Sequence, residues 1–332
     1  MRWSACVQGR RDGRFLQRGD KRHLCGAVSS TYPPRLQVYL AFAAIYILWG
    51  STYFAIKEAL TGFPPFMLGG LRFAAAAVLL FSWCGAKRIP VMTTGLWKVL
   101  LVGFLLLFAG NGAVVWAQQT LPSSVVAITI AVAPLAFAAM DRPQWSVNFR
   151  SPATVLGIVG GILGVWLLFK DRLSAQLSST GMDAETMALL VLTIGILAWP
   201  AGSLFGKYYP VSLSNVANSA WQMLTGAVFF LAASLLRGEW NGFDWAAVPA
   251  KAWIAEAYLV IFGSIIGFSA YVWLLQVRPA TQVSTYAYVN PVVAVLLGTW
   301  LGGEVLGAHE VLGLVVILGG VLLINLAKYR AG

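Results

Sequence analysis

Residues 38–56 read VYLAFAAIYILWGSTYFAI, a run that holds no charged side chain. A helix rises about 1.5 Å per residue, so a run of this length crosses the hydrocarbon core of a bilayer, which is about 30 Å thick. Comparable apolar runs follow at about 64–84, 97–117, 122–140, 153–169, 187–206, 214–236, 254–276, 280–301 and 306–327. The sequence therefore predicts an all-α integral membrane protein with about ten transmembrane helices.

The composition of the whole chain supports the same class of protein. Of the 332 residues, 59% are hydrophobic and 11% are charged, whereas soluble domains carry about 25% charged residues. The net charge of +11 comes from basic residues in the first segment and in the loops between apolar runs. That distribution is typical of charges that orient a membrane protein. We therefore expect a lipid bilayer as partner and no nucleic acid.

Residues 1–35 differ from the remainder because they are polar and basic, and they end near Pro33-Pro34. They lack the short apolar stretch and small-residue cleavage site of a signal peptide. A disordered tail, an upstream start codon and a functional basic arm are all compatible with this segment. Its cysteines, Cys6 and Cys25, lie with Cys84 in segments predicted to be cytoplasmic, so no disulfide and no metal site is expected.

A polar connection at 170–186 divides the membrane portion into two halves, 36–169 and 187–328, with five predicted spans each. Several residues recur at a constant offset between the halves. The offset is 150 for Trp49 and Trp199, Lys57 and Lys207, and Arg72 and Gln222, and it is 157 for Trp116 and Trp273, Pro122 and Pro279, and Pro134 and Pro291. The sequence therefore predicts an internal repeat.

An odd number of spans per half means that the second half enters the membrane from the opposite side. Such inverted repeats are common in secondary transporters, because two copies of opposite orientation have inward-open and outward-open forms of similar energy. Lys and Arg are more abundant on the side that holds the N-terminus, which predicts that both termini are cytoplasmic.

Five stretches carry a resemblance to a known family. They are Tyr46-Ile-Leu-Trp-Gly-Ser-Thr-Tyr53, Pro64-Pro-Phe to Leu71-Arg-Phe-Ala, Gly110-Asn-Gly112, Leu121-Pro-Ser-Ser, and Ser284 to Gly298 with Gly302-Gly-Glu304. They resemble the EamA-type members of the drug/metabolite transporter superfamily, and among these the YedA-like exporters. The resemblance covers about 36–328. It implies ten helices in two inverted five-helix repeats, an inner-membrane transporter or exporter, and a substrate cavity between the repeats.

Ionisable residues inside membrane spans are costly and are therefore candidates for function. Arg72 lies within the second predicted span, where it either binds an anionic group of the substrate or caps helix carbonyls and fixes helix packing. Glu256 is expected near the membrane interface and in contact with water, and Glu304 is expected to cap or pair locally. No pair of buried carboxylates suggests a proton relay.

Polar and aromatic residues inside the spans form the larger candidate set. Buried Asn and Ser need hydrogen-bond partners, so they face protein or water rather than lipid. Trp and Tyr bind planar, amphipathic or cationic solutes, although they also form belts at membrane interfaces. The predicted substrate-binding residues are Trp49, Ser51, Arg72, Asn111, Trp116, Trp199, Ser203, Tyr271, Trp273, Tyr288 and Asn290.

Pro134 and Pro291 are predicted hinges, because a proline inside a helix removes a hydrogen bond and kinks the helix. Tyr286, Tyr288 and Asn290 alternate along the chain, so they share one face only if the ninth span is distorted.

These features favour a secondary transporter of small organic molecules such as amino acids, other metabolites or drug-like compounds. A channel, a non-transporting scaffold and an intramembrane enzyme are the alternatives. The spans hold no H-E-x-x-H motif and no P-loop, so we predict no catalytic residue, metal or cofactor. Monomer and homodimer both remain open.

Overall fold

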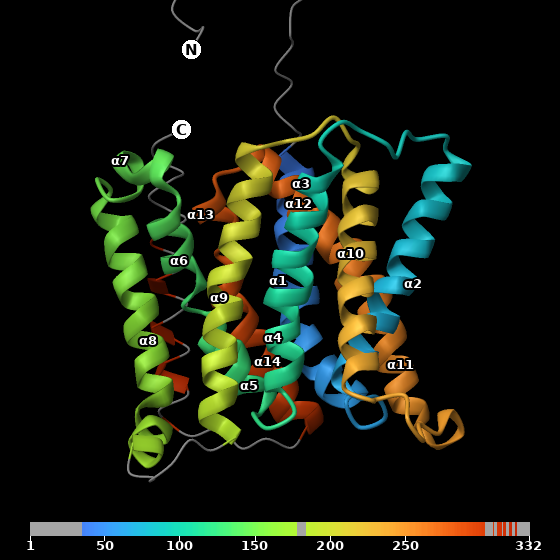
Figure 1. Ribbon diagram of the computed structural model, residues 1–332. Helices are drawn as coiled ribbons and strands as arrows, with labels where there is room; N and C mark the ends of the chain where they lie inside the picture. The colour runs from blue at the N-terminus through green and yellow to red at the C-terminus, as the bar shows by residue number, and fades with distance from the viewer. Residues whose placement is uncertain are drawn as a thin grey trace, which may run out of the picture. The chain divides into compact units, whose positions relative to one another are not determined.

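The computed structural model describes residues 35–177 and 184–302, together with scattered positions between 308 and 323. Every regular element in these described ranges is a helix (Figure 1). The helical class that the sequence predicts is therefore what the structure shows. The predicted tail at 1–35 falls almost entirely outside the described residues, as do Glu304 and most of the predicted span at 306–327.

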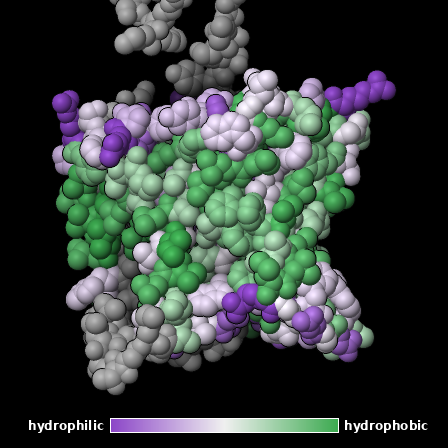
Figure 2. Space-filling view, in the orientation of Figure 1, coloured by the Kyte–Doolittle hydropathy of each residue, from purple (hydrophilic) through white to green (hydrophobic). Residues whose placement is uncertain are grey.

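Within the described residues, six helical segments are long and apolar enough to cross a membrane. They are α1 (Arg35–Ala59), α2 (Pro65–Ala86), the segment formed by α3 (Leu96–Gly103), η1 (Phe104–Asn111) and α4 (Gly112–Ala117), α9 (Ala184–Tyr208), α10 (Asn215–Leu236), and the segment formed by α11 (Ala250–Tyr258), η4 (Leu259–Gly267) and α12 (Phe268–Val277). Their ends lie within about one helical turn of the predicted ones. Figure 2 shows a belt of hydrophobic surface across this face, with hydrophilic residues gathered along its upper and lower edges.

Two other predicted spans are divided in the structure. The span predicted at 122–140 consists of α5 (Ser123–Ile130) and α6 (Ala133–Met140), with Pro134 in the first turn of α6. Proline is tolerated there because the first turn of a helix needs no amide donor. The span predicted at 280–301 consists of α13 (Ala280–Val283) and α14 (Tyr286–Gly302).

Pro291 does not interrupt α14, which runs continuously through it. A break in this region lies between α13 and α14, one to two turns before Pro291, and the kink at Pro291 stays a prediction.

The connection predicted at 170–186 is shorter than expected. After η2 (Arg142–Gln144) and α7 (Trp145–Asn148), α8 (Pro152–Leu177) extends eight residues beyond the predicted end of its span, and α9 begins at Ala184. The sequence pattern marks where apolar residues stop, whereas a helix continues as long as its backbone hydrogen bonds do. Composition therefore did not locate the end of this helix.

The closest helix pair is α2 with α10, which lie side by side in Figure 1. Glycines make this approach possible, because a Cβ at Gly69 would lie 2.3 Å from Cε1 of Phe230, and a Cβ at Gly70 would lie 2.5 Å from Cδ2 of Leu231. Small residues at such crossings are the usual way in which membrane helices pack tightly. Cys84, near the end of α2, has no exposed surface.

Two segments of π-helix, η1 and η4, interrupt the third and eighth predicted spans. The offset of 157 that relates Trp116 to Trp273 also relates Gly110 in η1 to Gly267 in η4. A π turn holds an extra residue and is often found at functional sites. Both segments reach the middle of the helix bundle.

Two lysines that the repeat relates make related contacts. Lys57, at the end of α1, donates to the carbonyl of Gln118 at 3.1 Å. Lys207, at the end of α9, donates to the carbonyls of Leu275 and, at 2.7 Å, of Arg278. Gln118 and Leu275 differ by the same offset of 157. Each lysine thus places a cation at the carboxyl end of a helix, where the helix dipole favours positive charge.

The carboxylate of Glu239 caps the beginning of α2, because it accepts from the amides of Phe66 at 3.3 Å and Met67 at 2.7 Å. Glu239→Ala is expected to lower the free energy of unfolding by about 1 kcal/mol, because two amides lose their acceptor. The control is Glu58→Ala, which removes an ion pair with the largely exposed Lys251 at 3.3 Å and is expected to cost less than about 0.5 kcal/mol. Thermal denaturation in detergent measures both, and equal losses would contradict the capping role.

Candidate functional site

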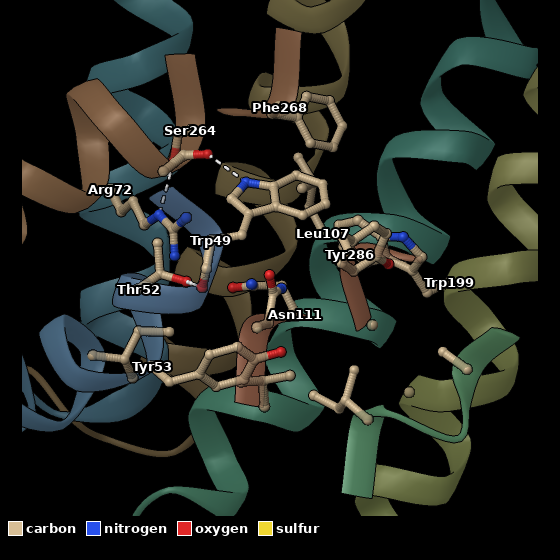
Figure 3. Close-up of a pocket in the computed structure, with 18 of the residues that line it drawn as sticks. Trp49, Thr52, Tyr53, Arg72, Leu107, Asn111, Trp199, Ser264, Phe268 and Tyr286 are labelled. Carbon is tan, nitrogen blue, oxygen red and sulfur yellow. Dashed lines mark hydrogen bonds between the residues drawn. The ribbon is translucent and has the colours of Figure 1, made fainter. Parts of the chain in front are cut away.

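A cavity of about 760 Å³, a volume that includes its opening, lies among the central helices. Its walls come from α1, α2, η1, α9, η4 and α14, so both predicted halves of the chain contribute (Figure 3). Its lining is mostly apolar with a few polar groups, which is the character of small-molecule sites. The aromatic side chains that line it are Trp49, Tyr53, Phe73, Trp199, Phe268 and Tyr286.

Trp49 is the centre of the aromatic wall. Its ring lies 5.5 Å from that of Trp199 and 5.0 Å from that of Tyr286, edge to face in both cases. Its Nε1 donates to the carbonyl of Gly263 at 3.1 Å. Edge-to-face pairs are a favoured geometry for aromatic rings, and the buried indole N–H has its partner. Trp49 is therefore held in one orientation.

Glycines in the two π-helical segments make room for the two tryptophans. A Cβ at Gly267 in η4 would lie 2.6 Å from Nε1 of Trp49, and a Cβ at Gly110 in η1 would lie 2.9 Å from Cε3 of Trp199. The repeat relates Trp49 to Trp199 and Gly110 to Gly267. The two halves therefore present matched contacts to the cavity, each a tryptophan of one half against a glycine of the other.

Arg72 carries the one formal charge among the described residues that line the cavity. Its side chain is 4% exposed, and its Nε donates to Oγ of Ser264 at 2.7 Å. The guanidinium lies between Ser264 and Thr52, close to Trp49 (Figure 3). Its two Nη groups hydrogen-bond to no residue that the structure describes, so they are the donors that a bound molecule can use.

Glu256 is buried rather than in contact with water at the interface as predicted, because its side chain is only 6% exposed. Its helical neighbours Ala252 and Leu259 pack into a cluster with α1 and α2, so this face of α11 points into the bundle. Neither carboxylate oxygen has a partner among the described residues. Closeness to the start of a span gave its depth along the helix but not the direction in which it faces.

The remaining polar lining comes from residues that hold one another in place. With its amide turned so that the nitrogen faces acceptors, Asn290 donates to the carbonyls of Tyr286 at 3.0 Å and Tyr46 at 3.2 Å. The Oδ1 of Asn111 is buried and has no partner among the described residues.

Of the predicted site residues, Trp49, Arg72, Asn111, Trp199 and Asn290 line the cavity together. Ser203 and Tyr271 stand directly behind this lining. Their hydroxyl groups lie 2.6 Å apart, and Nε1 of Trp199 donates to the Tyr271 hydroxyl at 2.9 Å. Both residues therefore position Trp199.

Four predicted residues lie elsewhere. Ser51 hydrogen-bonds to the hydroxyl of Tyr258 at 2.5 Å. Trp116 and Trp273 are half-buried and pack against hydrophobic clusters, but neither is among the residues that line the cavity. Tyr288 is buried in a separate small cluster with α6 and α8.

Tyr286 takes the place that the sequence analysis gave to Tyr288. Tyr286 and Asn290 are four residues apart and share a face of a regular helix, whereas Tyr288 lies about 200° around it. No distortion of α14 is needed, and the spacing alone favoured Tyr286. The other lining residues missed were Thr52, Tyr53, Phe73, Ser264 and Phe268, whose types are too common in membrane helices to stand out.

Comparison with known proteins gives one family. The model of the EamA-like transporter family matches residues 36–170 and 186–326. The inner membrane transporter YedA of Escherichia coli K12 is 38% identical over 300 residues, which cover 89% of this chain and 92% of that protein. The transporter YoaV of Bacillus subtilis is 23% identical, with 87% and 94% covered.

One solved crystal structure superposes on this chain with a TM-score of 0.70 at 19% identity, covering 90% of this chain and 99% of the other. At that identity the match shows a shared fold. The helical fold, the two matched segments and the identity to YedA lead to one conclusion: the chain belongs to the EamA-like transporter family.

Proposed function

We propose that the protein moves small organic molecules across the inner membrane by alternating access, with the cargo held in the cavity around Trp49 and Trp199. The observation that carries this proposal is that residues of both halves, 36–169 and 187–328, form the walls of one cavity. The name of the relative YedA, an inner membrane transporter, supports the location and the class of activity.

The proposal includes ten spans in two halves of opposite orientation. Matched features support it, namely the two π-helical segments, the two tryptophan–glycine contacts and the two lysines at helix ends. Halves related in this way give inward-open and outward-open forms of similar energy, which alternating access requires.

Orientation and direction are further parts of the proposal. The excess of Lys and Arg on the side of the N-terminus supports cytoplasmic termini, and resemblance to exporters supports export. One chain supplies all the described walls of the cavity, so a monomer is sufficient for the site whether or not a homodimer forms.

The test is counterflow of a mixed pool of labelled metabolites in proteoliposomes. We expect saturable exchange of particular solutes, at least a tenfold loss with Trp49→Ala, and a loss of a few fold with Trp49→Phe. Phenylalanine keeps the ring contacts but removes the hydrogen bond to the Gly263 carbonyl. The control is Trp300→Ala, because Trp300 is 76% exposed and is expected to leave exchange within about twofold of the parent.

Gel filtration of each variant shows whether it is folded, and Trp49→Phe remains informative if Trp49→Ala is not. Flux that does not saturate would favour a channel. Equal exchange by all variants would remove the cavity from the mechanism, and no exchange by the parent would favour a scaffold.

A further inference from the structure

The cavity is electrically one-sided. Arg72 is its one formally charged described residue, is more than nine-tenths buried, and has both Nη groups free of described protein partners. A cation in a membrane interior is costly unless an anion balances it. Guanidinium groups bind carboxylates through paired N–H donors, so the vacant donors suit an organic anion.

The repeat makes this feature more telling, because the other half does not share it. The positions related to Arg72 and Ser264 are Gln222 and Leu107. Gln222 donates to Asn218 at 3.0 Å instead of facing a polar partner in η1. The related positions therefore hold uncharged side chains, so the repeat alone does not require an arginine and a serine. The charge of Arg72 is therefore present in one half of the chain and not in the other, and we take it as a sign of a ligand.

Glu256 is the second unbalanced charge near this place. It lies two helical turns before Ser264 in the same segment, and both of its oxygens lack described partners. Ala252 and Leu259, one turn on either side of it, pack in one cluster with Leu68 of α2, which lies one turn before Arg72, and no salt bridge joins Glu256 to Arg72 among the described residues. When ionised, Glu256 offsets the field of Arg72, and when protonated it leaves that field to a bound anion.

The other ionisable groups on the helices around Glu256 are engaged elsewhere. On α1, Lys57 donates to the Gln118 carbonyl and Glu58 pairs with Lys251 of α11, while Tyr258 of α11 hydrogen-bonds to Ser51 and Glu239 caps α2. Arg72 is therefore the charge from α2 that responds to the state of Glu256.

We propose that Arg72 binds the carboxylate of an organic anion against the aromatic wall, and that this binding is coupled to protonation of Glu256, so that anion and proton bind together. The proposal deepens the transport function and rests on it. Coupling is reciprocal by linkage: the anion favours proton uptake, and the proton favours anion binding. The aromatic side chains around Arg72 suit a planar body on the anion.

The experiment is titration calorimetry of the full chain in detergent, in two buffers of different ionisation enthalpy, which gives the protons taken up per ligand. The probes are benzoate and indole-3-acetate, with benzamide and indole-3-acetamide as uncharged matches. We expect the acids to bind at least tenfold more tightly than the amides. Up to one proton enters per acid bound, and acid affinity falls by up to about tenfold per pH unit as pH rises through the titration of Glu256.

The variants separate the two parts of the proposal. Glu256→Gln, which mimics the protonated acid, is expected to keep acid binding while losing proton uptake and pH dependence. Arg72→Gln is expected to lose the preference for acids over amides by at least tenfold. Arg72→Lys, which keeps the charge, is expected to retain part of the preference for acids over amides. It replaces Arg72→Gln as the test if that variant does not fold. Glu58→Gln, at a more exposed carboxylate, is the control and is expected to match the parent.

Equal binding of acids and amides by the parent, or no binding of either acid, would overturn the anion site. Proton uptake that persists in Glu256→Gln would overturn the coupling. Acid binding with linked proton uptake but without counterflow would leave the inference standing and remove the transport function. Counterflow of uncharged solutes alone would leave the transport function standing and remove the inference.

Discussion

Replacing Gly69 by alanine is expected to lower the free energy of unfolding by about 2–3 kcal/mol, whereas the same change at Gly85 is expected to leave it unchanged or raise it slightly. Both glycines lie in α2, so both gain the same intrinsic preference of alanine for helix. They differ in what the new methyl group meets. A Cβ at Gly69 would lie 2.3 Å from the Phe230 ring, and a Cβ at Gly85 has nothing within 4 Å.

The Phe230 ring has little freedom to move aside. It is fully buried and lies 5.6 Å from Phe73 and 5.4 Å from Phe108, measured between ring centroids. Interiors packed at this density absorb an added methyl only by shifting helices. The clash therefore falls on the contact between α2 and α10, which joins the two halves of the chain.

Thermal denaturation and folded yield in detergent measure the effect. The double variant Gly69→Ala with Phe230→Leu is expected to be more stable than the sum of the two single changes predicts, because leucine vacates part of the ring's space. If the two alanine variants proved equally stable, α2 and α10 would have to be further apart than described.

Lys207→Met is expected to lower the free energy of unfolding by about 2–4 kcal/mol, against about 1 kcal/mol for Lys57→Met. Lys207 donates to the carbonyls of Leu275 and Arg278, and it lies in the electrostatic range of Asp141, which is fully buried. Lys57 has one carbonyl partner. Methionine preserves the length of the side chain and removes its charge and donors.

The expected difference follows from what each variant leaves unpaired. Without Lys207, the end of α12 loses two hydrogen bonds, and the hydroxyl of Tyr208 is the partner that Asp141 keeps among the described residues. Lys207→Arg is expected to recover most of the loss because it restores a cation with several donors. Equal destabilisation by Lys207→Met and Lys57→Met, measured by denaturation in detergent, would show that the second carbonyl and Asp141 contribute nothing.

The sequence predicted the positions of the long spans because a bilayer requires runs of apolar residues, and such runs are visible in composition alone. It could not predict the π-helical segments η1 and η4, because a run of apolar residues has the same composition whether it forms an α-helix or a π-helix. The burial of Glu256 was misjudged for a related reason. Hydropathy shows how far a residue lies along a helix, whereas burial depends on which neighbour its face meets.

The repeat was the most useful guide to the cavity. It paired Trp49 with Trp199 before any geometry was known, and both line the same space. It did not identify Ser264, whose counterpart in the other half is Leu107. An argument from similarity between the halves cannot identify residues at which the halves differ. Ser264, the polar partner of Arg72, is such a residue.

Cys84 gives the molecule a built-in reporter. Among the described residues it is the one cysteine, and no solvent reaches it in this structure. A thiol reacts only where a reagent meets its thiolate, so alkylation of Cys84 requires α2 to separate from its neighbours. Once Cys6 and Cys25 are replaced by serine, the rate of maleimide labelling of Cys84 measures how often that opening occurs. Cargo that changes the resting conformation would raise or lower this rate.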